Sequence, residues 1–137
     1  MKVIEGGVTA AQGFLAAGLS AGIKKGNTKD MAMLYSKVPC EAAGTFTTNI
    51  VKAAPVKWDQ KIVYESEKAQ AVICNSGIAN ACTGEEGFGC CKETAKAASL
   101  ALNIPEDSVL VASTGVIGQQ IPIEKIKKGI ENMAPLL

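Results

Sequence analysis

A hydroxyl group stands beside a glycine at the point where an apolar run of residues ends. The stretch VASTGVIGQQIP covers residues 111–122, and in it Ser113 and Thr114 come directly before Gly115. Because Gly115 has no Cβ, a substrate carbonyl can approach its backbone N–H, and the Thr114 hydroxyl can donate a second hydrogen bond to the same oxygen. Two converging donors form an oxyanion hole, in which loss of one donor typically lowers the rate by about 10²–10³. Thr-Gly pairs are also common in ordinary turns, so the pair alone leaves a structural role open.

A second polar turn, NSGIANACTG, covers residues 75–84. Its asparagine, serine and threonine side chains are of the kind that satisfy turns and helix caps in most proteins. The functional alternative is a loop that orients a ligand at a helix N-terminus, where free N–H groups favour an anion such as a carboxylate. Both interpretations remain open at this point.

The chain contains no histidine, which excludes Ser-His and Cys-His nucleophile pairs within it. The cysteines are five in number and form no C-x-x-C pair: Cys40, Cys74, Cys82, Cys90 and Cys91. They are most simply interpreted as small buried apolar side chains in a reducing cell, with an iron–sulfur or zinc site as the less favoured alternative. Neither a phosphate-binding loop nor a dinucleotide fingerprint is present. We therefore predict no metal site and no resident cofactor.

The composition is that of one ordinary domain. The 137 residues are 47% hydrophobic and 20% charged, with a net charge of +1. This balance gives no electrostatic footprint for nucleic acid or for an anionic membrane, and 4% aromatic residues argue against a base-stacking platform. No apolar run reaches 18 residues, and the N-terminus lacks the apolar region of a signal peptide. We expect a single α/β domain over residues 1–137 in a cytoplasmic protein.

The second half of the chain twice repeats a strand, a glycine-containing turn and a helix. Apolar runs at 71–75 and 107–113 predict buried strands. Thr83 and Glu86 fit a capping box that starts a helix running to about Leu102, with Lys92 and Lys96 on its exposed face.

A second helix is predicted to start at Pro122. Spacings of three and four residues place one apolar stripe on it, formed by Ile123, Ile126, Ile130 and Met133. Three lysines, Lys125, Lys127 and Lys128, fall away from that stripe and are expected to be solvated.

The first half is less regular. Glycine and alanine crowd residues 6–26 and favour strands or loops pressed against a neighbour over a long helix. Short apolar and β-branched runs predict strands at 31–36 and 43–49, and 56–66 can hold a short helix. The fold class is α/β, a layered sandwich of a buried sheet with flanking helices.

Four stretches, taken in order, carry a family resemblance. They are GGVTAAQGFLAAGLSAGIK, AAGTFTTNIVKAAPV, ICNSGIANACTG and VASTGVIGQQIP. Together they resemble the ornithine acetyltransferase family, the glutamate N-acetyltransferases of arginine biosynthesis. The third stretch has Ile78 where that family often has asparagine. The resemblance implies an N-terminal-nucleophile-like acetyltransferase fold, present here only in part.

The resemblance also implies a mechanism. Members of the family cut themselves before a threonine, and the new N-terminal threonine of the β chain is the nucleophile, activated by its own α-amine. This agrees with the absence of histidine. Thr114 and Gly115 match the oxyanion-hole pair of the family, which moves acetyl from N2-acetylornithine to glutamate. An α2β2 heterotetramer is implied, with acetyl-CoA as a co-substrate if the enzyme is bifunctional.

The sequence departs from the family at its end, because it stops before the remaining α-chain segment and the cleavage threonine. We therefore expect the chain alone to be inactive, and no substrate-contacting residue is assigned. Two other functions stay open: a non-catalytic carboxylate-binding or scaffold domain, and an amidohydrolase or aminopeptidase with an N-terminal nucleophile.

Overall fold

One mixed sheet forms the centre of the molecule. In residues 3, 5–66 and 68–137, which the computed structural model describes, four strands lie in the order β1-β2-β3-β4. The strands are β1 (Phe14–Leu19), β2 (Met31–Glu41), β3 (Lys68–Ile78) and β4 (Val109–Val116). The helices are α1 (Ala54–Glu65), α2 (Gly84–Leu102) and α3 (Ile123–Met133). Short 3₁₀ turns cover Val8–Ala10, Glu106–Ser108 and Ala134–Leu136.

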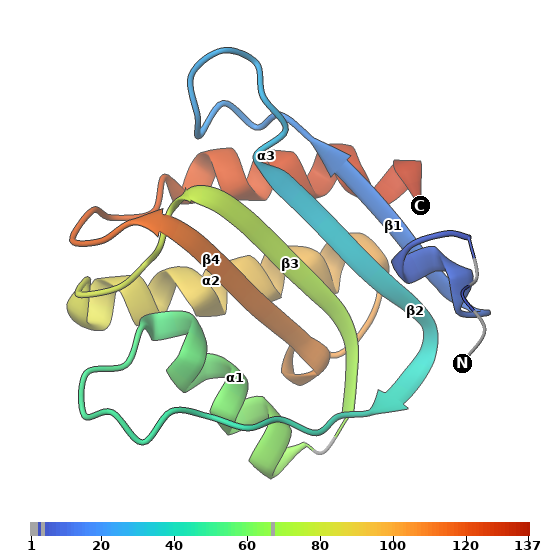
Figure 1. The fold of residues 1–137 in the computed structure, drawn as a ribbon, viewed down its shortest axis with the longest axis horizontal. Coiled ribbons are helices and arrows are strands. Elements are labelled where there is room, and N and C mark those ends of the chain that lie inside the picture. The colour runs from blue at the N-terminus through green and yellow to red at the C-terminus, as the bar shows by residue number, and fades with distance from the viewer. Residues whose placement is uncertain (1–2, 4, 67) are drawn as a thin grey trace.

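The sheet is antiparallel on one side and parallel on the other. β2 pairs antiparallel with both β1 and β3, whereas β3 and β4 are parallel and are connected through α2. The C-terminal ends of β3 and β4 therefore lie side by side at one end of the sheet, and α2 and α3 both begin after these strand ends (Figure 1). The strand-turn-helix repeat of the sequence is thus confirmed, although residues 107–108 of the predicted second strand lie in a 3₁₀ turn.

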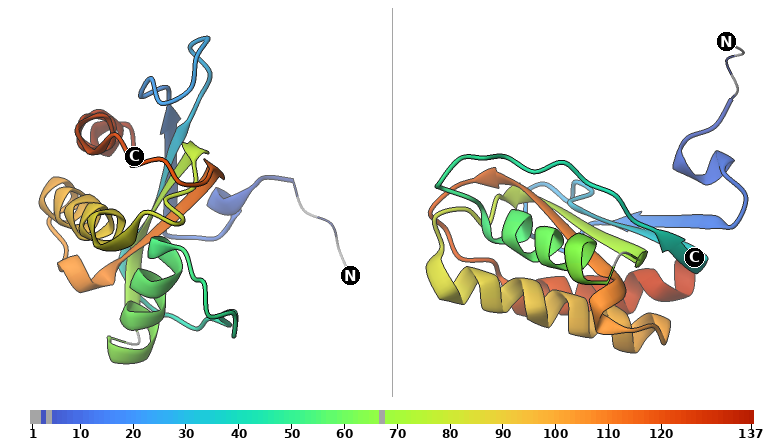
Figure 2. Two further views of the ribbon diagram at one scale, coloured as in Figure 1. Left: turned by 90° about the vertical axis from the view of Figure 1, so that its left-hand side faces the viewer. Right: turned by 90° about the horizontal axis from the view of Figure 1, so that it is seen from below.

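Helices α2 and α3 cover the same face of the sheet (Figure 2). Alternate residues of three strands point toward them and are buried: Met31, Met33, Ala71, Ile73, Val109 and Val111. From α3, Ile126, Ile130 and Met133 complete this core, while Ile123 of the predicted stripe is only half-buried. A Cβ at Gly129 would collide with the sulfur of Met31, so this glycine lets α3 lie close to β2.

Helix α1 closes the free edge of β4. The Trp58 indole donates to the carbonyl of Val109 at 2.9 Å, and the Asp59 carboxylate accepts from the N–H of Val111 at 2.9 Å. Backbone groups of an edge strand are otherwise open to unwanted pairing. These contacts fix the first half of β4 against α1.

Residues 43–49 were predicted to form a strand, and this prediction is wrong. β2 is already paired with β1 on one side and β3 on the other, and after Glu41 the chain runs in irregular conformation to α1. Local side chains bind the backbone there, since Asn49 N–H donates to the Thr47 hydroxyl and Val51 N–H donates to the Asn49 side chain. β-branched residues favour a strand only where a partner strand is available.

The predictions for the exposed lysines are confirmed with one exception. Lys92, Lys96, Lys125 and Lys128 are exposed, although Lys125 Nζ also donates to the carbonyl of Gly22 at 2.6 Å. Lys127 is instead partly covered and forms ion pairs with Glu93 of α2 and Glu124. It connects the two helices rather than being simply solvated.

The second face of the sheet carries no helix, and it is turned to the viewer in Figure 1. Leu34, Val72, Cys74 and Leu110 point to this face and are only half-buried, and Ala32 and Ala112 are exposed. The apolar runs predicted buried strands, and within the described residues helices cover only one face of these strands. No helix in the described ranges is both long enough and apolar enough to cross a bilayer.

Candidate functional site

The two polar turns that the sequence singles out lie side by side. In the parallel ladder Ser76 is opposite Thr114, and Gly77 is opposite Gly115. Beyond the strands, the N–H of Ala79 donates to the carbonyl of Val116 at 2.9 Å. The N–H of Gly118 donates to the carbonyl of Ala81 at 2.8 Å, so the turns stay paired where the ladder ends.

Thr114 and Gly115 are exposed at the end of β4. Side chains alternate along a strand, which places Thr114 on the face of the sheet opposite the helices. Among the described residues, the Thr114 hydroxyl has no hydrogen-bond partner. The N–H of Val111 points to the outer edge of β4, and the same alternation directs the N–H of Gly115 that way. Both donors are therefore directed away from the packed core.

Backbone geometry requires glycine at the paired positions. Gly77 has φ +108° and Gly115 has φ +136°, which side chains rarely permit. A Cβ at Gly115 would collide with the carbonyl of Gly77 and lie 2.6 Å from the nitrogen of Ile78. The backbone of β3 therefore leaves no space for a side chain at position 115, whether or not a substrate is bound.

Ser113 does not join Thr114, because it points to the opposite face. Its hydroxyl donates to Asn75 Oδ1 at 2.6 Å, and Asn75 Nδ2 donates to the carbonyl of Ile78 at 2.9 Å. Asn75 is buried, so both its polar groups are used inside the protein. The hydrogen bond between Ser113 and Asn75 connects the ends of β3 and β4. It lies on the helix-covered face and helps to position Thr114 and Gly115.

The predicted capping box at the start of α2 is wrong. Thr83 makes no cap hydrogen bond and Glu86 is exposed. The Thr83 hydroxyl instead donates to Asn80 Oδ1 at 2.7 Å, and Asn80 Nδ2 donates to the carbonyl of Gly87 at 2.9 Å. A Cβ at Gly87 would collide with the Thr83 hydroxyl, so the glycine lets these side chains pack over the first turn of the helix.

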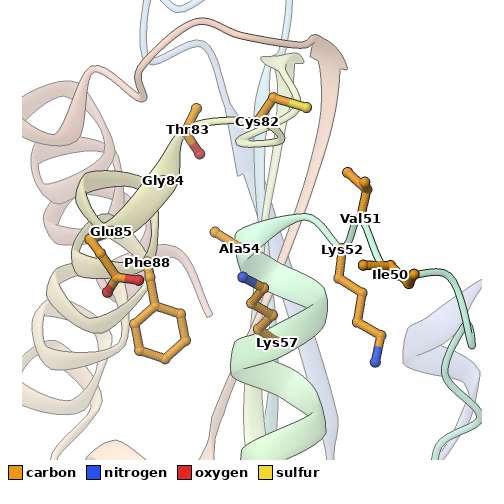
Figure 3. A pocket seen from close by; sticks show the side chains of 10 residues that line it. All are labelled: Ile50, Val51, Lys52, Ala54, Lys57, Cys82, Thr83, Gly84, Glu85 and Phe88. Atoms are coloured by element: carbon orange, nitrogen blue, oxygen red, sulfur yellow. The ribbon is translucent and has the colours of Figure 1, made fainter.

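A pocket of about 400 Å³ lies between the first turns of α1 and α2 (Figure 3). Lys52, Lys57 and Glu85 line it together with Cys82 and Phe88. Neither Thr114 nor Gly115 contributes to its wall. The pocket is therefore separate from the candidate oxyanion pair.

The cysteines are all free, and two are buried as expected. Burial raises the pKa of Cys91 to about 12, so its thiol stays neutral. Cys82 departs from the prediction because it is exposed. In the described part of the chain, no three Cys, Asp or Glu side chains are close enough to hold a metal ion.

Two acidic side chains beside the strands have shifted pKa values. Burial raises the pKa of Asp59 to about 6, partly offset by the N–H of Val111 that its carboxylate accepts. Burial also opposes ionisation of Asp30, but backbone N–H groups, that of Lys24 first, outweigh it and lower the pKa of Asp30. The carboxylate of Asp30 therefore stays ionised in the folded protein.

Sequence reasoning missed Lys24 and Asp30 in the loop between β1 and β2. This loop lies at the same end of the sheet as the C-terminal ends of β3 and β4 (Figure 1). Asp30 accepts hydrogen bonds from the loop backbone, and Lys24 Nζ donates to the Ser76 hydroxyl at 3.4 Å. Lys24 and Ser76 are 52 residues apart, so no local pattern could have paired them.

Comparison with known proteins places this geometry in context. The model of the ArgJ family matches residues 15–137. The chain is 51% identical over 124 residues to an "Arginine biosynthesis bifunctional protein ArgJ" of Gloeobacter violaceus, covering 90% of this chain and 30% of that protein. A protein of the same name from Thermotoga neapolitana is 50% identical over 121 residues, again with 30% of its length covered. The chain thus spans about a third of the length of these curated relatives.

Solved structures agree with this similarity. The ornithine acetyltransferase of Mycobacterium tuberculosis, solved in complex with ornithine, superposes with a TM-score of 0.90 at 44% identity. An arginine biosynthesis bifunctional protein of Bacillus halodurans superposes with a TM-score of 0.88 at 41% identity. Each match covers 94% of this chain and 69% of the other.

Proposed function

Because the chain belongs to the ArgJ family, we propose that it is the N-terminal part of an acetyltransferase of arginine biosynthesis. The whole enzyme moves the acetyl group of N2-acetylornithine to glutamate. The contribution of this chain is the oxyanion hole, formed by the Thr114 hydroxyl and the Gly115 N–H.

One observation carries the assignment. A hydroxyl without a partner among the described residues and a backbone N–H directed to the outer edge of β4 stand next to each other at the end of a well-fixed strand. Asn75, Ser113 and the paired glycine Gly77 position this strand end from within the chain. Donors held in place before the reaction are the arrangement that stabilises a developing oxyanion.

The chemistry consists of two acyl transfers. A threonine hydroxyl of the β chain, with its α-amine as base, attacks the acetyl carbonyl of N2-acetylornithine. The tetrahedral intermediate places its negative oxygen between Thr114 and Gly115, and its collapse expels ornithine. The amine of glutamate then attacks the acetyl-threonine ester through a second tetrahedral intermediate, which frees the threonine and yields N-acetylglutamate.

The β chain and the rest of the α chain are the partners that this mechanism needs, in an α2β2 assembly. The helix-free face of the sheet supports such a partnership, since it exposes apolar side chains next to Thr114. Apolar area of this kind favours a covering layer. The chain spans about a third of the length of its relatives, so the remainder of a protein of that length is sufficient to form such a covering layer.

Acetyl-CoA is a second acetyl donor in this proposal if the enzyme is bifunctional, as the names of its relatives have it. It reacts as a co-substrate, and no resident cofactor is required. The cytoplasm is the proposed compartment, because free cysteines such as Cys82 persist in a reducing environment.

The test compares two proteins in one assay. The full-length protein, which includes the segments beyond residue 137, should form N-acetylglutamate from N2-acetylornithine and glutamate. The purified 137-residue chain should form none, because the proposed threonine nucleophile belongs to the β chain. Turnover by the chain alone, or none by a folded and cleaved full-length protein, would refute the proposal.

A further inference from the structure

The turn that follows the proposed oxyanion pair is held by the segment that follows β3. The N–H of Ala79 donates to the carbonyl of Val116 at 2.9 Å, and the N–H of Gly118 donates to the carbonyl of Ala81 at 2.8 Å. Asn80 stands between Ala79 and Ala81, and Val116 comes directly after the pair. A shift of the segment around Asn80 is therefore transmitted to the end of β4.

Asn80 is buried, with 2% of its surface exposed, and both ends of its side-chain amide are bonded. Its Oδ1 accepts the hydroxyl of Thr83 at 2.7 Å. Its Nδ2 donates to the carbonyl of Gly87 at 2.9 Å and to Cys91 Sγ at 3.3 Å. These three partners lie directly before α2 or in its first half. A buried polar network that is fully bonded is rigid, so the amide fixes the segment to α2.

The backbone of Asn80 is bound to the other helix. Its carbonyl accepts the N–H of Ala54, the first residue of α1, at 3.1 Å. Its φ is +50°, a left-handed conformation that asparagine tolerates better than most residues. Such a conformation persists only where the surrounding structure enforces it. One residue thus connects the starts of α1 and α2 to the end of β4.

We propose that Asn80 is a positioning residue for the oxyanion hole, holding Thr114 and Gly115 in place through the backbone hydrogen bonds of Ala79 and Ala81. The inference rests on the function proposed above. Because Asn80 is buried, it acts through the backbone and not on the substrate. A displacement of about 1 Å can cost about 10²-fold in rate, so loss of this side chain should affect kcat more than substrate binding.

The test measures acetyl transfer from N2-acetylornithine to glutamate by the full-length enzyme. Asn80→Gly removes the side chain and keeps the left-handed backbone accessible. We expect kcat to fall about 10–100-fold. KM for N2-acetylornithine should stay within about twofold, because no ground-state contact is lost. Thr83→Val removes only the donor to Asn80 Oδ1 and should lower kcat by a smaller factor. If Asn80→Gly does not fold, an unchanged kcat in Thr83→Val overturns the proposal.

Ile130→Ala is the matched control for lost stability. Ile130 is fully buried under α3, so its replacement should lower the melting temperature. Its kcat should stay near that of wild type at a temperature where every variant is folded. If Asn80→Gly melts at lower temperature but also keeps its kcat, Asn80 has only a structural role and the proposal is overturned.

A double-mutant cycle tests whether Asn80 acts through the oxyanion pair. In the Thr114→Ala enzyme, Asn80→Gly should lower kcat by a smaller factor than in wild type, because one of the two donors it positions is already absent. The same factor in both enzymes would mean that Asn80 acts independently of Thr114, which contradicts the proposal.

Hydrogen exchange separates this inference from the proposed function. Mass spectrometry of the full-length protein compares wild type and Asn80→Gly over residues 114–120 and, as an internal control, over α3. Exchange should become faster in the first segment and stay unchanged in α3. If wild type transfers no acetyl group, faster exchange still supports the control of this strand end by Asn80, and only the function fails. Unchanged exchange over 114–120 overturns the role of Asn80 and leaves the function intact.

Discussion

At the scale of single residues, the site depends on two glycines that face each other across β3 and β4. Gly77 and Gly115 both have positive φ, and there is no space for a Cβ at Gly115 against the backbone of Gly77. Conformations of this kind persist only where the surrounding structure enforces them. The candidate donors therefore occupy a strand end whose shape is fixed by the backbone itself.

Replacing Gly115 with alanine should lower the free energy of unfolding by about 3 kcal/mol or more, because strain at positive φ adds to overpacking against Gly77. Gly118→Ala is the control, since its φ is also positive but a Cβ there meets nothing within 4 Å. That variant should lose only about 1–2 kcal/mol. Urea unfolding of both variants measures the difference, and equal losses would show that the contact with Gly77 is relieved at little cost.

At the scale of elements, α3 is attached to the core through its apolar stripe. Ile126 is 2% exposed, and its replacement by alanine should cost about 2–5 kcal/mol. Ile123→Ala, at the half-buried end of the same stripe, should cost clearly less. Thermal or urea unfolding of the pair checks the ranking, and a loss below about 0.5 kcal/mol for Ile126→Ala would mean that the stripe does not hold the helix in solution.

The contact between α1 and β4 should make stability depend on pH. Burial raises the pKa of Asp59 from 3.8 to about 6 in the folded state. The folded state then binds the proton more tightly than the unfolded state, so this group favours folding at low pH and loses that contribution as pH rises from about 4 to about 6. Asp59→Asn should remove this slope while keeping an acceptor for Val111. Urea unfolding at pH 4, 5, 6 and 7 tests it, and identical pH profiles for the two proteins would contradict the assignment.

Local patterns predict the elements well and the contacts between them poorly. The spacing of isoleucines in α3 and the apolar runs of β3 and β4 depend on neighbours close in sequence, and these predictions are confirmed. Residues 43–49 have strand-like composition but no strand beside them, and Thr83 binds Asn80 instead of capping α2. The approach of Lys24 to Ser76 depends on the order of strands in the sheet, which composition does not reveal.

At the scale of the whole molecule, α2 and α3 cover one face of the sheet, and no helix of the described residues covers the other, which we call the open face. Leu34 of β2 is half-buried on the open face, whereas its neighbour Met33 is 1% exposed against the helices. If the rest of the proposed full-length protein covers the open face, the same substitution should have different costs in the 137-residue chain and in the full-length protein.

Leu34→Thr should change the unfolding free energy of the 137-residue chain by only about 0.5 kcal/mol. In the full-length protein it should cost about 1–3 kcal/mol, because the side chain is then buried. Met33→Thr is the control and should destabilise both proteins strongly. Equal effects of Leu34→Thr in both would indicate that nothing covers this face.

We propose that this chain supplies the oxyanion hole, and the kcat of Thr114→Ala in the full-length enzyme measures that contribution. Because the hydroxyl bonds an oxygen that is charged only in the transition state and intermediate, kcat for acetyl transfer should fall by about 10²–10³. The melting temperature and the affinity for N2-acetylornithine should stay near those of wild type. A variant that melts at lower temperature but keeps a normal kcat would make Thr114 a turn residue and contradict the account.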